Sequence, residues 1–314
     1  MPAFGNSVKG WRERRGIFVV ARAGDLHGVG EASPLPGYLD ADLGELEREL
    51  RDLDTFEVDP DDPLASVPSM THSTSQFAIE TAIVDMVGRA RGVEACQVLA
   101  ERPAERCQVY PVISEATAEF QRCKVKIGRD LETELDLISA LRTAGVAVRV
   151  DANRSLPARD FIATLERLAA LGVELCEEPT ELGAMLAARE LPLPIALDET
   201  LQADDGSERA RALAADGKLG ALVIKPAAVG GLRRALALAE LADELGCQII
   251  ISHMLDGPIA LAAACELALA VDRGTPHGLA AHPGLAAYPP ISVPQLSETG
   301  IHRHGQPGLG VAWP

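Results

Sequence analysis

From about residue 107 onward, the chain alternates short apolar runs with amphipathic segments. Each run is followed by a break of polar residues, Gly or Pro, and then by a segment whose apolar residues recur every three or four positions. Short apolar runs indicate buried strands, and the three- and four-residue spacing indicates helices, which here end at Gly. Eight runs fit the strand pattern, at 107–114, 123–128, 146–153, 173–179, 194–200, 219–226, 247–254 and 277–282.

Strands that alternate with helices favour a parallel sheet. Eight such units within residues 106–289 fit a closed barrel better than an open sheet. We therefore predict an α/β fold whose catalytic domain is a (β/α)7β TIM-like barrel, with an open doubly wound sheet as the alternative. The glycine string GVGEAS at 28–33 is not a dinucleotide-binding motif, because it lacks the third glycine and does not open a helix.

Residues 1–105 follow a different pattern and predict an α+β capping domain. Hairpin strands are expected at 15–24 and 27–38, and helices near 41–53 and 73–91. The tail, 290–314, is rich in Pro and Gly and too short to fold alone. We expect this tail to pack on the capping domain and, with it, to cover the barrel.

Charge and cysteine usage limit the classes of partner. A net charge of −17 argues against nucleic acid and anionic membranes, because the field of the protein repels polyanions. A small anionic substrate would therefore need locally placed cations. The six cysteines show no C-x-x-C spacing, the first residues are too polar for a signal peptide, and no uncharged apolar run reaches membrane-spanning length. We predict a cytoplasmic protein with free thiols, and leave formation of a homo-oligomer open.

Charged residues gather where five consecutive predicted strands end. Catalytic groups of such barrels lie at the carboxyl ends of the strands. The residues are Lys124 and Lys126, Asp151 and Asn153, Glu177 and Glu178, Asp198 and Glu199, and Lys225. One inward carboxylate from each of three neighbouring strands suits Mg²⁺, and only one acid of each adjacent pair can point inward. A single such acid would more often be a helix cap or a loop-edge residue, but three in register favour a metal site.

The stretch QRCKVKIG at 121–128 places Lys124 and Lys126 on one strand face. On this stretch alone, a solvated edge strand protected by lysines is an equally good interpretation. In a ring of eight strands, however, the second and sixth are opposite, so Lys126 and Lys225 would face each other across the mouth. Lysine, unlike arginine, can lose its proton, and two close amines predict a lowered pKa for one of them. The pattern predicts removal of a proton alpha to a metal-bound carboxylate, with the resulting enediolate held by metal and ammonium.

The motifs K-x-K, D-A-N, E-E-P and D-E-T, with the lysine of VIKPAAVGG, resemble the enolase superfamily, in particular its muconate-lactonizing-enzyme subgroup. Within that subgroup, GEASPLPGY, RVDANRSL, ALDETL and the ending PGLGVAWP are most similar to o-succinylbenzoate synthase of menaquinone biosynthesis. The resemblance implies a lyase that catalyses the Mg²⁺-dependent syn dehydration of 2-succinyl-6-hydroxy-2,4-cyclohexadiene-1-carboxylate to o-succinylbenzoate.

The resemblance also implies roles for single residues. It selects Asp151, Glu177 and Asp198 as ligands of Mg²⁺, for which Mn²⁺ could substitute, with Asn153 and Glu199 beside them. It implies that Lys126 takes the proton and then, as its conjugate acid, helps hydroxide leave on the same face. Lys225 would stabilise the enediolate by a cation–π contact, and Lys124 would tune Lys126.

Three further residues lie near the predicted site. Arg149 shares the face of Asp151 and would help a carboxylate or the lysine pair, or else form a buried structural ion pair. Ser252 could bind the succinyl carboxylate, whereas His253 is expected to point away and pack. Two features depart from the family: the strand-seven end SHMLDGPIALAAA, which includes Asp256, and a short segment before Trp11, which implies a trimmed cap or an incomplete start.

Two other classes of function compete with the lyase. One is an isomerase of the same superfamily: an N-acylamino acid racemase, a dipeptide epimerase or a muconate cycloisomerase. Dipeptide epimerases usually carry Asp-x-Asp on the eighth strand, which GLAAHPGL at 278–285 lacks. The other is a binding protein that has lost its activity, which predicts loss of a metal ligand or a lysine, and none is lost.

Overall fold

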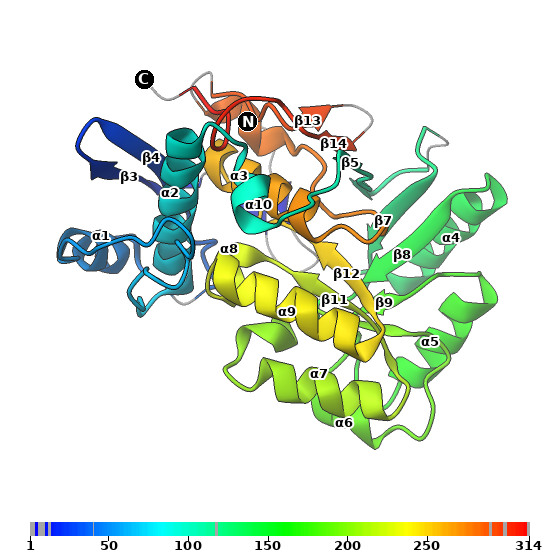
Figure 1. Cartoon of the computed structure of the whole chain (residues 1–314). Helices are drawn as coiled ribbons and strands as arrows, with labels where there is room; N and C mark the ends of the chain where they lie inside the picture. Colours follow the sequence, from blue (N-terminus) through cyan, green and yellow to red (C-terminus); the bar gives the residue numbers. More distant parts are fainter. Residues whose placement is uncertain are drawn as a thin grey trace.

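Seven parallel strands form the centre of the protein, as a computed structural model shows (Figure 1). The structure describes residues 4–5, 10–11, 14–39, 41–116, 119–288, 291–297 and 300–312. In the sheet each strand pairs with the next along the chain, from β6 to β12. The strands are β6 (Val112–Ile113), β7 (Arg122–Lys126), β8 (Ala147–Asp151), β9 (Cys176–Glu177), β10 (Ile195–Leu197), β11 (Leu219–Ile224) and β12 (Gln248–Ile251).

The segment at 277–278 joins the two edges of this sheet. His277 forms a parallel bridge with Val109, just before β6, and Gly278 forms one with Ser252, directly after β12. The sheet therefore curls into a ring, which confirms the predicted TIM-like barrel. The last predicted run contributes these bridges rather than a full strand. The first run is divided, because Arg106–Cys107 (β5) pairs outside the barrel.

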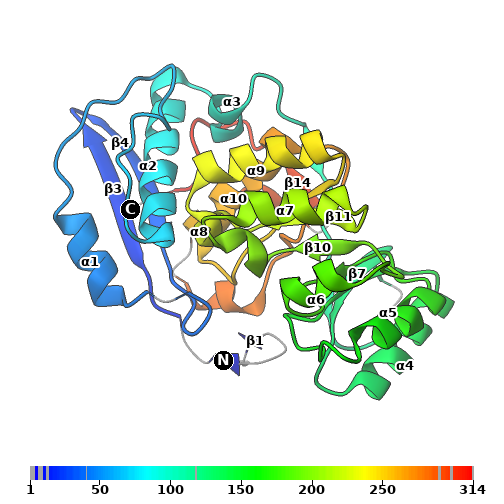
Figure 2. The ribbon, with the colours of Figure 1, turned by 90° about the horizontal axis from the view of Figure 1, so that it is seen from below.

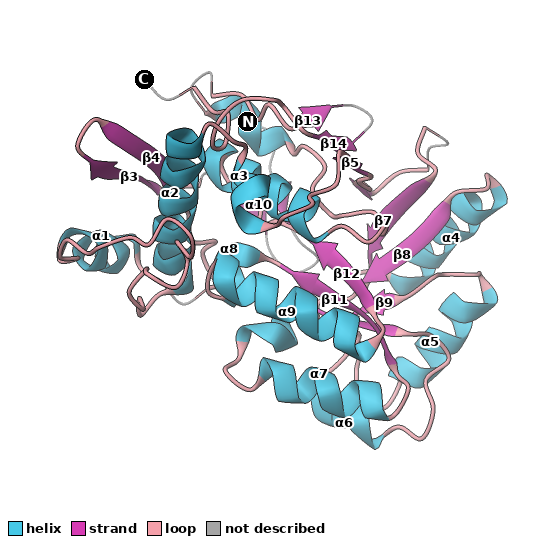
Figure 3. Cartoon of the chain, in the orientation of Figure 1, coloured by secondary structure: helices cyan, strands magenta, loops and turns pink. Residues whose placement is uncertain are grey.

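Helices surround the strands and follow the predicted alternation (Figure 3). They are α4 (Leu131–Thr143), α5 (Phe161–Ala170), α6 (Leu182–Ala187), the 3-10 helix Glu199–Gln202, α7 (Gly206–Ala215), α8 (Pro226–Val229), α9 (Leu232–Leu245), α10 (Pro258–Val271) and the 3-10 helix Pro283–Ala287. Helix α9 ends as its sequence predicts, because Gly246 adopts the left-handed conformation at φ 66°. In the part of the chain that the structure describes, no helix has the length and apolar character needed to cross a bilayer.

The N-terminal part of the chain lies beside the barrel (Figure 2). It contains β1 (Phe4–Gly5), β2 (Gly10–Trp11), the hairpin β3 (Ile17–Ala23) and β4 (Leu26–Ala32), and the helices α1 (Leu43–Arg51), α2 (Ser73–Arg91) and α3 (Ala95–Leu99). The predicted hairpin and both predicted helices are therefore present.

Glycines of β4 explain the string GVGEAS. A Cβ atom on Gly30 would lie 1.9 Å from the carbonyl oxygen of Ala78, and one on Gly28 would lie 2.0 Å from that of Ala82. Both carbonyls belong to α2, so the two glycines allow the strand to pack directly on the helix backbone. The string is a packing feature of the hairpin.

The C-terminal tail packs on this N-terminal part and on β5. Strands β13 (Leu296–Ser297) and β14 (Gly300–His302) form an antiparallel sheet with β5. The backbone N–H of Leu309 donates to Asp85 of α2, at 2.7 Å. The backbone N–H groups of His304 and Gly305 donate to Glu94, at 2.7 and 2.9 Å. The domain limits at 105 and 289 themselves stay predictions.

Candidate active site

Alternate residues of the barrel strands point into the barrel. Ala221 and Val223 of β11 belong to a buried cluster with Tyr110, Leu175, Ala196 and Ile250 that is separate from the core between sheet and helices. Successive strand residues face opposite sides, so the residue two positions further along is again inward. Four polar residues each lie two positions after a member of this cluster: Glu177 after Leu175, Asp198 after Ala196, Lys225 after Val223 and Ser252 after Ile250. Because side chains alternate along each strand, these polar groups face the inside of the barrel at the carboxyl ends of the strands.

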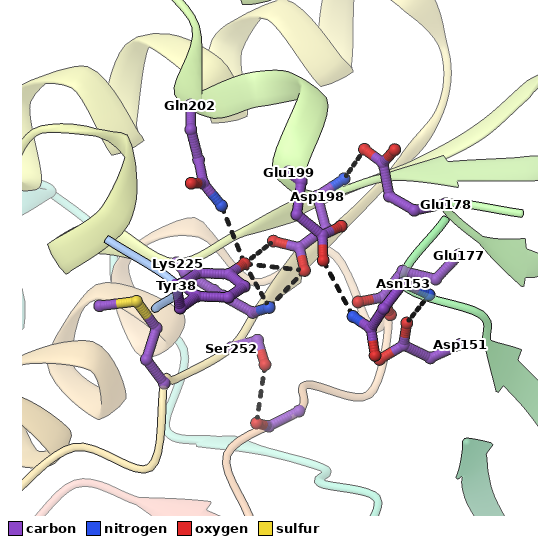
Figure 4. A network of polar contacts seen from close by, with 12 residues as sticks. Tyr38, Asp151, Asn153, Glu177, Glu178, Asp198, Glu199, Gln202, Lys225 and Ser252 are labelled. Carbon is purple, nitrogen blue, oxygen red and sulfur yellow. Dashed lines mark hydrogen bonds and ion pairs between the residues drawn. The ribbon is translucent and has the colours of Figure 1, made fainter. Parts of the chain in front are cut away.

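Three buried carboxylates meet at this end (Figure 4). Asp151 of β8 is paired with Glu177 of β9, and Asp198 follows β10, the next strand. Each of the three residues is 1% exposed. Glu177 Oε1 is buried and has no hydrogen-bond partner among the described residues. Such a set of oxygen donors with an unsatisfied oxygen fits a hard divalent cation such as Mg²⁺.

Three lysines offset the charge of these acids. Lys124 Nζ lies 2.9 Å from Glu177 Oε2 and 3.2 Å from Asp151 Oδ2. Lys126 Nζ lies 2.8 Å from the same Asp151 oxygen, and Lys225 pairs with Asp198. Strand β7 lies between β6 and β8, and Lys124 is 5% exposed, so the solvated edge-strand interpretation is wrong.

The acids differ in electrostatic environment. Burial, together with the neighbouring carboxylate of Asp151, raises the pKa of Glu177 to about 7. Burial also raises the pKa of Asp198 to about 6, although an ammonium group lies beside it. Burial acts in the same direction on Asp151, but the ammonium groups of the two β7 lysines outweigh it and hold the pKa of Asp151 below its usual value. Further positive charge would favour the ionised form of all three.

The predicted lowering of a lysine pKa does not occur at Lys124. Burial favours its neutral form, but the carboxylates of Glu177 and Asp151 outweigh burial and raise the pKa of Lys124 above its usual value. Along the sequence Lys124 has only cations as charged neighbours on its strand face, whereas in the fold the acids of the adjacent strands lie beside it.

Asn153 and Glu199 lie beside the carboxylates, as their positions predict. Asn153 Nδ2 donates to Glu199 Oε1 at 2.9 Å, and Asn153 Oδ1 accepts from Lys126 Nζ at 2.9 Å. Asn153 has a left-handed backbone at φ 44°. Through these two hydrogen bonds, Asn153 links Lys126 on β7 to Glu199 after β10.

Some of the strand-end groups line a cavity of about 130 Å³, whereas Glu177, Asp198 and Glu199 do not. Its lining comprises Leu35, Tyr38, Val112, Lys124, Lys126, Asp151, Asn153, Lys225, Ser252, His253, Met254, Leu255 and Gly278. Lys126 and Lys225 thus share one cavity. Ser252 Oγ donates to the carbonyl oxygen of Gly278 at 3.2 Å. A larger cleft of about 710 Å³ adjoins Tyr38 and Gln202, but none of the charged strand-end groups lines it, so its size does not identify the site.

Tyr38 is a site residue to which the sequence assigned no role. It follows β4 in the N-terminal part of the chain, and its hydroxyl lies 3.2 Å from both carboxylate oxygens of Asp198. The hydroxyl accepts from Lys225 Nζ at 3.0 Å and from Gln202 Nε2 at 2.8 Å. The Lys225 ammonium also lies 4.9 Å from the centre of the Tyr38 ring. In the sequence, only the Pro-Gly turn that directly precedes Tyr38 could have indicated that this aromatic residue lies on a loop able to reach the site.

Arg149 does not reach the cavity. Its Nε lies 3.2 Å from Glu174, its Nη2 donates to Gln248 at 2.9 Å, and its guanidinium lies over the ring of Tyr110. The structure agrees with the second of its two predicted roles, a structural ion pair, in which Arg149 is buried and Glu174 is partly exposed. The reason is that Arg149 lies two residues before the strand end.

The residues after β12 lie beside the cavity or behind it. His253 is among the residues that line the cavity, and its ring packs on His282 with the ring centres 5.1 Å apart. The ring nitrogens of His253 are hydrogen-bonded, since Nδ1 accepts from Leu255 N at 2.8 Å and Nε2 lies 3.2 Å from Ala280 O. Asp256 is paired with Arg14 at 3.0 Å and does not line the cavity.

A second cluster, Cys107, Asp272 and His277, brings three potential metal ligands within 4.8 Å of one another. His277 Nδ1 accepts a hydrogen bond from the backbone N–H of Ile251 at 3.0 Å. In the neutral ring the proton is then on Nε2, the nitrogen that faces Asp272 at 3.4 Å. Burial raises the pKa of the Cys107 thiol to about 12. His277 Nε2 and Asp272 Oδ1 are both buried and have no hydrogen-bond partner among the described residues.

A sequence profile of the family described as enolase C-terminal domain-like matches residues 111–314. The chain belongs to the enolase superfamily. This confirms the family that the K-x-K, D-A-N, E-E-P and D-E-T motifs resemble.

Curated relatives carry two kinds of name. Muconate cycloisomerase 1-1 of Acinetobacter lwoffii is 32% identical over 214 residues, which cover 62% of this chain and 55% of the relative. The o-succinylbenzoate synthase of Citrobacter koseri is 28% identical over 280 residues, which cover 85% of this chain and 83% of the relative. The chain thus spans about half the length of the cycloisomerase and most of the synthase.

A solved structure confirms the fold of this superfamily member. The muconate lactonizing enzyme from Pseudomonas fluorescens, complexed with muconolactone, superposes with a TM-score of 0.84 over 99% of this chain and 92% of that chain. The two sequences are 20% identical, so the likeness concerns the fold alone. The predicted barrel with an adjoining smaller domain agrees with it.

Proposed function

We propose that this superfamily member is an o-succinylbenzoate synthase-like lyase. It would remove water from 2-succinyl-6-hydroxy-2,4-cyclohexadiene-1-carboxylate with syn stereochemistry and supply o-succinylbenzoate for menaquinone biosynthesis. The observation that carries the proposal is the set of three acids at adjacent strand ends, with Lys126 and Lys225 lining the same cavity. The alignment with a synthase over 85% of the chain supports this substrate.

The acids and lysines then divide the reaction between them. Asp151, Glu177 and Asp198 would hold Mg²⁺, or Mn²⁺ in its place, and the ion would neutralise the substrate carboxylate and so make the alpha C–H bond more acidic. Lys126, as the free amine, takes this proton; as the ammonium it then protonates the departing hydroxide on the same face. One C–H and one C–O bond break, a C=C bond forms, and water leaves.

The remaining lysines would act through their charge. Lys225, on the other side of the cavity, stabilises the negative charge that develops on the substrate, partly through a cation–π contact. Lys124 lies between Glu177 and Asp151 and tunes the field around Lys126. Ser252 lines the cavity, and its hydroxyl would turn from the carbonyl oxygen of Gly278 to donate to the succinyl carboxylate.

An isomerase of the same superfamily is the second candidate. Lysines line the cavity from β7 and from the end of β11, and a racemase or epimerase uses a proton donor and acceptor on each face of the substrate carbon. A muconate cycloisomerase is also among the relatives. The strand-eight region lacks Asp-x-Asp, which counts against a dipeptide epimerase.

Our first experiment follows the loss of cyclohexadiene absorbance with Mg²⁺, for wild type, Lys126→Ala and Lys126→Arg. Arginine keeps the positive charge but does not lose its proton, so both variants should lose at least about 10³-fold in kcat if Lys126 is the base. Chelator should abolish turnover by wild type. Turnover that survives in Lys126→Arg would contradict the assigned base.

A second assay separates the two candidates. If wild type does not dehydrate this substrate but exchanges the alpha proton of N-acylamino acids or dipeptides with D₂O, the machinery is that proposed and the substrate is wrong. No activity in either assay, and no cycloisomerisation of muconate, would reject both candidates.

We also infer a cytoplasmic location. The six cysteines are free, and five of them are buried, which agrees with a reducing compartment. The small anionic carboxylate substrate would be bound by the cations of the cavity, against the net charge of −17.

A further inference from the structure

Glu178 directly follows the candidate ligand Glu177 but has a different environment. Like Glu177, it is buried and absent from the cavity lining, but its carboxylate is fully hydrogen-bonded, whereas Glu177 Oε1 has no hydrogen-bond partner among the described residues. Its Oε1 accepts hydrogen bonds from the backbone N–H groups of Asp198, at 2.9 Å, and of Thr200, at 2.7 Å. Figure 4 shows the Glu178 carboxylate pointing to the backbone beside Asp198. This carboxylate therefore holds the segment that carries another candidate ligand.

Arg154, which follows β8, joins the contact between Glu178 and the segment after β10. Its Nε donates to Glu178 Oε2 at 2.9 Å, and its Nη2 donates to Thr200 Oγ1 at 2.9 Å. The Thr200 hydroxyl in turn donates to Glu178 Oε2 at 3.0 Å. Three side chains thus join the segments that follow β8, β9 and β10, and each of these strands supplies one of the candidate metal ligands.

The backbone at these positions is unusual and needs support. Glu178 has φ 40° and Arg154 has φ 60°, in the left-handed region that non-glycine residues seldom occupy. Such conformations persist where the surrounding contacts compensate for their cost, of roughly 1–3 kcal/mol each. The backbone N–H of Arg154 also donates to Glu178 O at 2.7 Å. The contacts among Glu178, Arg154 and Thr200 supply this compensation.

We propose that Glu178, supported by Arg154, is a positioning residue for the metal ligand Asp198. This inference rests on the proposed function, because it concerns the proposed Mg²⁺ site. A carboxylate that ligates a cation binds tightly only when its own backbone is held, and groups that hold ligands are typically worth 10- to 100-fold in metal affinity. In Glu178→Gln the amide oxygen can still accept from the N–H groups of Asp198 and Thr200, but the NH2 group in place of Oε2 would face two donors, Arg154 Nε and Thr200 Oγ1. The substitution therefore disrupts the contacts that hold this segment.

The chain offers a matched control for the substitution Glu178→Gln. Glu174 belongs to the same part of the chain and accepts from Arg122 and Arg149, so it too is a carboxylate in an arginine pair. It lies before β9, at the opposite end of that strand from the candidate ligands. Glu174→Gln should therefore lower the free energy of unfolding without changing Mg²⁺ affinity.

The test is isothermal titration of the whole protein with Mg²⁺ in the absence of substrate, with circular dichroism to confirm folding. We expect Glu178→Gln to bind Mg²⁺ about 10- to 100-fold more weakly than wild type, and Glu174→Gln to bind like wild type. Activity of Glu178→Gln should recover as Mg²⁺ is raised, whereas that of Lys126→Ala should not. Hydrogen exchange of the segment 197–202 should be faster in Glu178→Gln than in wild type.

Outcomes for this inference and for the proposed function can be told apart. If wild type binds Mg²⁺ and Glu178→Gln binds it equally well, the positioning role is wrong and the proposed function stands. If wild type binds no Mg²⁺, both fail. Should Glu178→Gln not fold, Thr200→Val and Arg154→Lys remove single contacts of the same group, and unchanged Mg²⁺ affinity in both would equally reject the inference.

Discussion

Tyr38 comes to the site from a different part of the chain than the strand-end acids and lysines. Its hydroxyl donates toward Asp198 and accepts from Lys225, so it contacts both a candidate metal ligand and the lysine on the far side of the cavity. Burial, with the nearby carboxylate of Asp198, raises the pKa of Tyr38, which keeps the hydroxyl protonated and able to donate. At the scale of single residues, the cap segment therefore completes the polar environment of the barrel.

Tyr38→Phe tests this contact with little change in shape. The ring over Lys225 is kept, whereas Asp198 loses a donor, and Lys225 and Gln202 each lose an acceptor. A hydrogen bond to a charged group contributes about 1.5–3 kcal/mol, so we expect kcat/KM to fall at least about tenfold with no loss of folding. Tyr38→Ala, which also removes the ring, should cost more. Unchanged kcat/KM in Tyr38→Phe would show that the hydroxyl contributes nothing to the reaction.

At the scale of elements, β4 and α2 define how the N-terminal part is built. The two elements approach closely because Gly28 and Gly30 present no side chain to the helix. The adjoining residue Glu31 then reaches the barrel, where its Oε2 accepts from the backbone N–H groups of Ile259 and Ala260 at the start of α10. The same strand thus packs on its own helix and caps a helix of the barrel.

Gly30→Ala should weaken this packing. The added Cβ would meet the backbone of Ala78 at 1.9 Å, which only a shift of the strand or the helix can relieve. Overpacking of this kind costs about 1–3 kcal/mol, to be measured as the free energy of unfolding in urea. Gly183→Ala is the control, because a Cβ at this helix position meets nothing within 4 Å and alanine favours helices. An equal free energy of unfolding for Gly30→Ala and wild type would mean that β4 and α2 are not closely packed at this position.

At the scale of the whole molecule, the free energy of unfolding depends on pH because the folded protein holds a histidine in its neutral form. Burial, reinforced by neighbouring His282, lowers the pKa of His253 from 6.5 to about 3. The unfolded chain binds a proton at this histidine below about pH 6.5, while the folded protein does not. Stability from this group is therefore present above that pH and is lost as the pH falls toward 3.

Urea unfolding of wild type and His253→Asn between pH 7 and 4.5 tests this dependence. Asparagine keeps an acceptor for the Leu255 N–H but cannot take a proton. One titrating group changes the free energy of unfolding by up to about 1.4 kcal/mol per pH unit, so the variant should lose less stability on acidification. Parallel curves for the two proteins would show that His253 does not titrate in the unfolding transition.

Much of the secondary structure could be predicted from the local periodicity of apolar residues. The hairpin 15–24 with 27–38, the helices near 41–53 and 73–91, and the alternation of strands and helices were predictable, because each depends on residues close in sequence. The two-residue period of strands also brought the inward acids and lysines to one end. Even so, the first and last runs of the barrel were predicted as full strands, although their pairing depends on partners more than a hundred residues away, such as Val109 with His277.

Contacts between distant parts of the chain were settled only by the fold. No period in the sequence relates Tyr38 to Asp198 or Glu178 to Thr200, and nothing local showed that Arg149 would pair below the cavity with Glu174. The residue types and their spacing thus limited the chemistry to a metal, carboxylates and lysines. Their partners, charges and neighbours followed from packing, because burial and hydrogen bonding depend on what surrounds a group in space.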